Sequence, residues 1–115
     1  LKSCKIIAIK IAKVGGLANA KKIHDLCQAH EIPVWCGGML DSGIGRAHNI
    51  AISSLGNFLF PGDVSASARY WQKDIIIPEV TVQNGFIHIP DKPGIGYEIE
   101  RECLQSKTVA STTIQ

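Results

Sequence analysis

The chain has 115 residues, 45% of them hydrophobic and 19% charged, and a formal net charge of +2. This length is that of one small domain and is too short for an eight-stranded barrel, while the composition is typical of a packed globular protein. The basic residues are scattered among acidic ones without a basic stripe, which argues against a nucleic-acid partner.

Neither membrane attachment nor a cysteine-based metal site is indicated. No stretch approaches the roughly 20 consecutive apolar residues that cross a bilayer, and the chain does not open with a charged leader and an apolar core. We therefore expect no membrane association and a cytoplasmic location. The cysteines form no CxxC pair, which predicts buried free thiols in a reducing compartment. They are Cys4, Cys27, Cys36 and Cys103.

The first half of the chain alternates between strand and helix patterns. Short, β-branched apolar runs predict buried strands, and apolar residues at helical spacing predict the helices between them. We expect strands over residues 4–11, 32–36 and 58–60, and helices over residues 17–30 and from an Asp41-Ser42 cap to residue 55. This order predicts consecutive βα units of a parallel sheet or barrel.

The pattern changes after residue 65. Residues 66–72 predict one short helical turn, and Asn84-Gly85 predicts a tight hairpin turn between strands over residues 80–82 and 86–89. Residues 97–100 alternate and predict an edge strand, whereas the polar tail from residue 105 is expected to fray. We therefore divide the chain into residues 1–65, the βαβαβ part, and residues 66–115, the hairpin and tail.

Lys10 stands at the end of an apolar strand. A buried ammonium group is costly unless it is paired or opens onto a polar site. In parallel α/β barrels the C-terminal ends of the strands face the active site. The residue pattern alone leaves two interpretations of Lys10, a catalytic group and a surface lysine whose stem covers apolar groups.

Glycine pairs follow the first two expected strands, at Gly15-Gly16 and at Gly37-Gly38. They are consistent with tight turns or with close approach of the backbone to a ligand. The strongest candidate for substrate contact is Gly38-Met39-Leu40, whose amides could point toward an acyl group or an anion. The four histidines do not converge in the sequence, so we expect packing or surface roles for them.

Several motifs in this order resemble one known family. They are IKIAKVGG at residues 9–16, PVWCGGML at 33–40, FPGDVSAS at 60–67 and PGIG at 93–96. Together they resemble the o-succinylbenzoate synthase and N-acylamino acid racemase family of the enolase superfamily, in its muconate lactonising enzyme subgroup. The resemblance extends over about residues 4–100.

The resemblance implies an α/β fold that is the C-terminal portion, about strands six to eight, of a modified TIM barrel of the (β/α)7β type. The hairpin and tail would then pack on the family's N-terminal capping domain. The family's strand-two lysines and its three acidic Mg2+ ligands have no counterpart here. We expect no metal ligand in this chain and place those ligands upstream, so that its partners would be the cap and strands one to five of the same enzyme.

The resemblance also implies an activity. Members remove the α-proton of a small-molecule carboxylate substrate, and Mg2+ stabilises the resulting enediolate. Lys10 corresponds to the family's strand-six lysine, and Gly38, Met39 and Leu40 would contact the substrate. In the synthase reaction, a dehydration in menaquinone biosynthesis, the strand-six lysine stabilises the intermediate as a cation, whereas racemisation needs proton exchange by both lysines.

One departure from the family pattern favours the synthase. The residue three after the catalytic lysine is often Arg in racemase-competent members, and it is Lys13 here; the two side chains differ in hydrogen-bond geometry. The alternatives are an N-acylamino acid racemase or dipeptide epimerase, and an inactive fragment that completes a barrel with another chain. Whether the protein is a homo-oligomer stays open.

Overall fold

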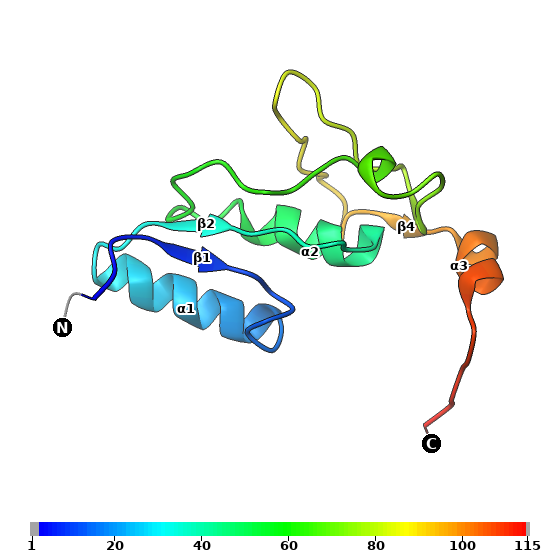
Figure 1. Ribbon diagram of the computed structural model, residues 1–115, viewed down its shortest axis with the longest axis horizontal. Helices are drawn as coiled ribbons and strands as arrows, with labels where there is room; N and C mark the ends of the chain where they lie inside the picture. Colours follow the sequence, from blue (N-terminus) through cyan, green and yellow to red (C-terminus); the bar gives the residue numbers. More distant parts are fainter. Residues whose placement is uncertain (1–2, 115) are drawn as a thin grey trace.

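The computed structural model of the chain describes residues 3–114. Its strands are short, and long loops follow α2 and β3 (Figure 1). In chain order they are β1 (Ile7–Ile9), α1 (Leu17–Ala29), β2 (Val34–Cys36), α2 (Gly43–Ile52), the 3₁₀ helix η1 (Ser67–Arg69), β3 (Ile76–Ile77), β4 (Glu98–Ile99) and α3 (Arg101–Lys107). Within the described residues, no helix is long and apolar enough to cross a membrane.

β1, α1 and β2 form a βαβ unit. The two strands pair in parallel, with Ile7 opposite Val34 and Ile9 opposite Cys36. Figure 1 shows α1 lying along one face of this pair. The helix returns the chain to the end from which the first strand began, which is what a parallel pair requires. The buried core of the unit consists of Ile9, Ala20, Cys27, Val34 and Cys36, and Ile52 at the end of α2 completes this cluster.

The expected strand over residues 58–60 is present only as an isolated parallel bridge between Val34 and Phe58. The Val34 amide donates to the carbonyl of Asn57 at 3.0 Å, and the Leu59 amide donates to the carbonyl of Val34 at 3.2 Å. This segment therefore lies on the far side of β2 from β1. The three segments follow one another in chain order, as expected for consecutive βα units.

The first strand is shorter than expected. The chain turns directly after Ile9, because the amides of Lys13 and Val14 both donate to the carbonyl of Lys10, at 2.9 and 3.2 Å. Residues before Ile7 lie outside the paired register. The expectation that Cys4 is buried is wrong, because this thiol is exposed, whereas the other three cysteines are buried as free thiols.

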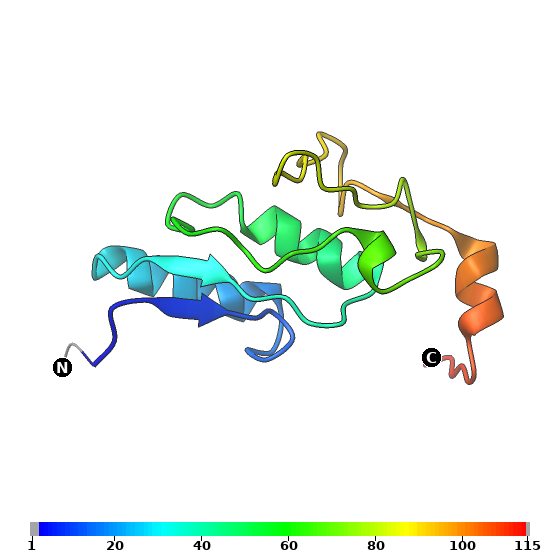
Figure 2. The same ribbon diagram turned by 45° about the horizontal axis from the view of Figure 1, so that its top comes forward.

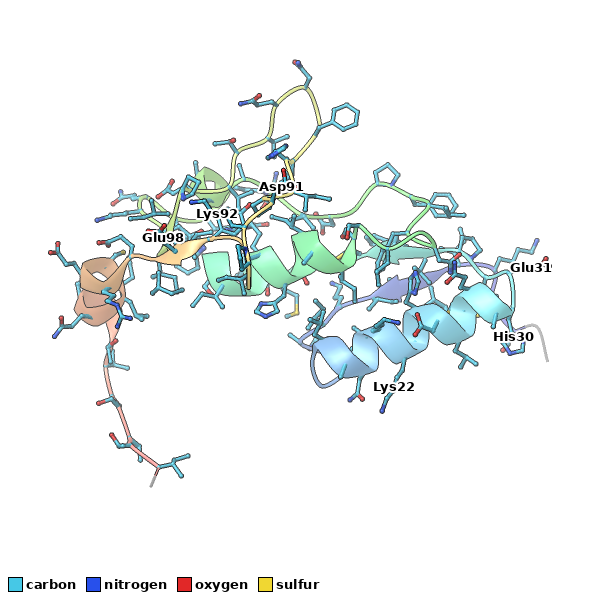
Figure 3. The ribbon with its side chains drawn as sticks, turned by 180° about the vertical axis from the view of Figure 1, so that it is seen from behind. Lys22, His30, Glu31, Asp91, Lys92 and Glu98 are labelled. Carbon is cyan, nitrogen blue, oxygen red and sulfur yellow. The ribbon has the colours of Figure 1, made fainter. Side chains whose placement is uncertain are left out.

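Both helices of the first half are confirmed. α1 ends one residue before the expected end at residue 30, and α2 begins after Ser42 and ends at Ile52, short of the expected residue 55. Figure 3 shows Lys22 directed away from the sheet on the outer side of α1, and His30 at the C-terminal end of this helix. The amphipathic pattern thus locates the helices and their buried faces.

The second half is only partly as expected. The hairpin turn is confirmed, because Asn84 and Gly85 both have positive φ, 51° and 82°, and Gln83 and Phe86 exchange two backbone hydrogen bonds of 2.9 Å. The strands expected over residues 80–82 and 86–89 are not formed, because the pairing is limited to this one bridge. The short helical turn expected within residues 66–72 is present as η1.

Two elements near the C-terminal end differ from expectation. The edge strand expected over residues 97–100 is β4, but it pairs antiparallel with β3, which the sequence did not predict. The tail expected to fray from residue 105 includes the end of α3, whose N-cap Glu100 accepts a hydrogen bond from the Cys103 amide at 2.7 Å. A side-chain cap of this kind satisfies one of the free amides of the first turn.

The molecule is flat and more extended than a compact domain. Its principal extents are 49 × 42 × 25 Å and its radius of gyration is 15.6 Å, against about 13 Å for a compact domain of this length. Figure 2 shows α1, α2 and the loops that follow as successive layers, with α3 standing apart at the far end. The division at residue 65 stays a prediction; buried contacts such as Ile50 with Ile76 cross it.

Candidate active site at the ends of the parallel strands

Lys10 follows β1 directly and is half-buried. Gly37 follows β2 on the neighbouring strand, and its amide donates to the carbonyl of Ile9 at 3.0 Å. A Cβ atom on Gly37 would lie 2.7 Å from Cε and 2.9 Å from Cγ of Lys10. The aliphatic stem of Lys10 therefore crosses the backbone of Gly37, and the absence of a side chain there makes room for it.

Gly38 lies against the chain that follows the third parallel segment, residues 58–60, so this segment also ends close to Lys10. A Cβ atom on Gly38 would collide with the backbone oxygen of Asp63, and the Asp63 amide donates to the carbonyl of Cys36 at 2.8 Å. Asp63 thus holds the loop after the third segment through its backbone. The ends of three parallel segments converge on Lys10, Gly37-Gly38 and Asp63.

The loop formed by Gly38, Met39 and Leu40 lies beside Lys10 because it continues directly from Gly37. The side chains of Met39 and Leu40 are 42% and 73% exposed, so both present apolar surface next to the strand ends. The Met39 amide donates to Oδ2 of Asp41 at 3.1 Å. The Met39 amide therefore already has a partner within the chain, and substrate contact by this loop stays a prediction.

A buried polar network lies beneath this loop. The carbonyl of Asp41 accepts hydrogen bonds from Nη2 of Arg46 and from Nε1 of Trp71, both at 3.1 Å. Nη1 of Arg46 pairs with Oδ2 of Asp74 at 2.9 Å, with both side chains almost completely buried. The loop is thereby linked through Arg46 to the segment that precedes β3.

Asp74 is fully satisfied by its surroundings. Its Oδ1 accepts hydrogen bonds from the amides of Gly43 and Ile75, both at 2.8 Å. Its Oδ2 accepts one from the Ser67 hydroxyl at 2.6 Å in addition to that from Arg46. Several short hydrogen bonds and a matched charge offset the cost of burying this carboxylate.

The sequence did not predict that the stem of Lys10 packs over Gly37. It also did not predict that Asp41, Arg46 and Asp74 hold the Gly38–Leu40 loop in place. One signal was available for Arg46, which interrupts the apolar face of α2 beside Ala47 and Ile50. A charged residue on the buried face of a helix requires a buried partner. Asp74 carried no such signal, because it lies in a polar connection far along the chain.

The histidines have the packing and surface roles that were expected. His24 is buried and stacks on Phe58 with ring centroids 5.6 Å apart, and its Nε2 accepts a hydrogen bond from the Asn57 amide at 3.2 Å. Nδ1 of His48 lies 2.8 Å from the carbonyl of Ile44 within α2. His30 and His88 are exposed.

Cys36 is the cysteine nearest to the strand ends. Burial raises the pKa of its thiol, with a smaller contribution from Asp41 and Asp63 in the same direction. Its Sγ lies 3.8 Å from the carbonyl of Asn49. A neutral, buried thiol is unreactive, so this residue is a packing group.

The residues of the strand ends do not fit a magnesium ion by themselves. Lys10 is a cation, and the carboxylate of Asp41 is already used by Met39 and Asn49. Among residues 3–114 no group of three or more His, Cys, Asp or Glu side chains is placed to hold a metal ion. Mg2+ favours carboxylate oxygens, so its ligands would have to come from outside this chain.

Comparison with known proteins gives a consistent result. The family model described as "Enolase C-terminal domain-like" matches residues 1–103. An o-succinylbenzoate synthase of Geobacillus kaustophilus is 59% identical over 108 residues, which are 94% of this chain and 29% of the relative. An N-succinylamino acid racemase of Amycolatopsis sp is 46% identical over 114 residues, 99% of this chain and 31% of the relative.

Solved structures show the same fold. A member of the enolase superfamily from Listeria innocua matches with a TM-score of 0.85 and 45% identity, over 90% of this chain and 28% of that one. A muconate lactonizing enzyme from Klebsiella pneumoniae matches with a TM-score of 0.80 and 25% identity, over 90% of this chain and 29% of that one. The expected α/β fold from the C-terminal part of a TIM barrel is confirmed.

The chain spans less than a third of the length of the relatives it matches, 29% for the Geobacillus protein. Its motifs, its parallel βαβ unit and its similarity over almost all of its own length agree. The chain therefore belongs to the enolase C-terminal domain-like family, in the branch that contains the o-succinylbenzoate synthases and the N-succinylamino acid racemases.

Proposed function

We propose that the full-length protein is an o-succinylbenzoate synthase, which dehydrates the cyclohexadiene succinyl carboxylate precursor of menaquinone biosynthesis. The observation that carries the proposal is the position of Lys10, at the end of β1 with its stem over Gly37. Barrel enzymes place their catalytic residues at the C-terminal ends of the parallel strands, and the ammonium group of Lys10 lies at such an end. The 59% identity to a synthase supports the choice of reaction.

In this proposal Lys10 stabilises the anionic intermediate as a cation. The substrate carries carboxylate groups, and negative charge develops when its α-proton is removed. A positioned cation beside that charge lowers the barrier because it needs no reorganisation at the moment of reaction. The proton transfers themselves would be made by a strand-two lysine outside this chain, and Mg2+ would be held by acidic ligands that are also outside it.

The Gly38–Leu40 loop would form one wall of the substrate site. Met39 and Leu40 expose apolar side chains beside the strand ends, a surface that suits the ring of the substrate. The amide of Gly38 is the loop's candidate donor for a carboxylate. The remaining walls would come from the capping domain and the other barrel strands of the same protein, so we expect no turnover by these 115 residues alone.

The proposal is tested with the full-length protein and Mg2+. Consumption of the cyclohexadiene precursor is followed in one assay, and exchange of the α-proton of an N-succinyl amino acid in deuterated water is followed in another. Dehydration with little exchange is the result expected for a dedicated synthase. Exchange without dehydration would overturn the proposal in favour of a racemase.

The racemase alternative is supported by the 46% identity to an N-succinylamino acid racemase. The presence of Lys13, where racemase-competent members often have Arg, favours the synthase over the racemase. This side chain is exposed, and its backbone amide donates to the carbonyl of Lys10 at 2.9 Å, so a change of its side chain acts close to the catalytic lysine. We expect Lys13→Arg to raise the ratio of α-proton exchange to dehydration, and an unchanged ratio would exclude Lys13 as a determinant.

A further inference from the structure

Asp41 connects the Gly38–Leu40 loop to the rest of the fold. Its carboxylate oxygen Oδ2 accepts the Met39 amide at 3.1 Å and the side-chain amide of Asn49 at 3.0 Å. Its carbonyl accepts hydrogen bonds from Arg46 and Trp71. One residue at the base of the loop is thus held by α2 and by the segment after η1.

A helix-capping role does not account for this carboxylate. The N-cap position of α2 is Ser42, which makes no side-chain cap hydrogen bond. The Gly43 amide at the start of the helix is satisfied by Asp74 at 2.8 Å. Asp41 instead turns back toward the loop that precedes the helix, so its carboxylate orders the loop and not the helix terminus.

The hydrogen bond from the Met39 N–H to Asp41 fixes the orientation of the peptide group between Gly38 and Met39. Because this peptide group is planar, the carbonyl of Gly38 on its other side is fixed as well. Gly38 is already pressed against the backbone of Asp63, and this leaves Met39 and Leu40 as the outward-facing side chains. A charge-assisted hydrogen bond is stronger than a neutral one, so loss of the carboxylate would release this arrangement.

We propose that Asp41 is a positioning residue that sets the Gly38–Leu40 loop for substrate binding, with Asn49, Arg46 and Trp71 holding it in place. This inference rests on the proposed function, in which the loop is a wall of the substrate site. Asp41 acts through the loop and does not itself contact the substrate. Its contribution therefore belongs to substrate affinity more than to the chemical step.

The test compares full-length Asp41→Ala with wild type in steady-state dehydration. We expect KM, and the Kd of the product o-succinylbenzoate, to rise about tenfold, the size of effect that follows from loss of a hydrogen bond to a charged group, with kcat of the folded enzyme changed by less than about threefold. Asp41→Asn keeps an oxygen that accepts both amides and should restore KM to within about threefold of wild type. Asp91→Ala removes an exposed carboxylate (Figure 3) and is the matched control, with KM unchanged.

Hydrogen exchange of the loop gives a second reading that does not depend on activity. Faster exchange confined to residues 37–42 in Asp41→Ala supports the positioning role. KM and product Kd within twofold of wild type in a folded Asp41→Ala protein would overturn it. If this variant does not fold, Asn49→Ala removes one donor to the carboxylate without touching the loop, and a KM unchanged in that variant would overturn the proposal equally.

Failure of the inference and failure of the proposed function are distinguishable. A wild-type protein without dehydration activity contradicts the synthase proposal, whatever the variants do. A wild-type protein with dehydration activity, whose KM is insensitive to Asp41→Ala, or to Asn49→Ala where Asp41→Ala does not fold, contradicts only the role of Asp41.

Discussion

Glycine stands at two adjacent positions where the strand ends converge, and each has a different neighbour. Gly37 lies under the flexible stem of Lys10, and Gly38 lies against the backbone of Asp63. A side chain can move aside at modest cost, whereas backbone held by hydrogen bonds cannot. Alanine at the two positions should therefore have different effects.

Gly37→Ala should impair activity more than stability. Its Cβ would lie 2.7 Å from Cε of Lys10, so the lysine stem must leave its place. With Lys10 in its proposed catalytic role, misplacement of the group costs on the order of 10²-fold in rate. We expect turnover to fall by about that factor while the free energy of unfolding of the full-length protein falls by about 1 kcal/mol. Turnover close to wild type would mean that the path of the stem is unimportant.

Gly38→Ala should mainly destabilise the fold. The new methyl group would meet the carbonyl of Asp63, whose amide is bound to Cys36 at 2.8 Å, so the backbone itself must shift. We expect a loss of at least about 3 kcal/mol, the upper end of ordinary overpacking, in denaturant unfolding of the full-length protein. A loss smaller than that of Gly37→Ala would contradict the distinction.

At the scale of the elements, α2 is anchored by the buried pair of Arg46 and Asp74. Removal of one partner leaves an uncompensated buried charge, which typically costs 3–5 kcal/mol. We expect about that loss for Asp74→Ala in denaturant unfolding of the full-length protein. Glu98→Ala breaks a pair with Lys92 in which both side chains are exposed and is the matched control, for which we expect a much smaller change. Equal effects of the two substitutions would show that the buried pair is not an anchor.

α3 should depend on pH through its N-cap. The hydrogen bond with Lys73, followed by that with the Cys103 amide, holds the pKa of Glu100 below the ordinary value of about 4.5. A carboxyl group whose pKa is lower in the folded state stabilises that state above its ordinary value, and this contribution is lost as pH falls through the lowered value. We expect hydrogen exchange in residues 101–107, corrected for its intrinsic rate, to accelerate below about pH 4.5 and to lose this dependence in Glu100→Gln. An unaltered pH dependence in that variant would assign the effect to another group.

The elements also show what the sequence could and could not predict. The helices of the first half have apolar faces that recur at helical spacing, so α1 and α2 were predicted within a few residues. β3 was missed because Pro78 follows it directly, and α3 was missed because its polar sequence has only Cys103 to bury. β3 depends on pairing with the distant β4, and α3 depends on its cap by the neighbouring Glu100. Neither interaction produces a periodic pattern of apolar residues in the sequence.

The parts of the candidate site that lie at the end of a single strand were predicted. The parts that depend on contacts between residues distant in the chain were missed. Lys10 and the Gly38–Leu40 loop stand directly at strand ends, which hydrophobic patterning locates. The Arg46–Asp74 pair joins residues from separate segments 28 positions apart. Such a pair has no local signature, and the same holds for the contact between Gly38 and Asp63.

At the scale of the whole molecule, the fold is open. Within residues 3–114 each of the two sheets has two strands. An apolar cavity of about 540 Å³ lies between α2 and the hairpin, where the Phe86 side chain is 78% exposed. Unpaired strand edges and exposed apolar surface favour association. We expect the isolated 115 residues to aggregate or to unfold without a cooperative transition, as measured by size-exclusion chromatography and chemical denaturation. Cooperative unfolding of a monomer would contradict this.

The most direct test of the account is dehydration of the cyclohexadiene precursor by the full-length protein with Mg2+, measured for wild type, Lys10→Ala and Lys5→Ala. Lys5 is an exposed lysine near the opposite end of β1 and serves as the matched control. We predict that Lys10→Ala lowers kcat by about 10²–10⁴-fold, as expected for a group that acts directly in catalysis, and that Lys5→Ala leaves it unchanged. Turnover by Lys10→Ala equal to that of wild type would show that Lys10 is structural and would contradict the account at its central residue.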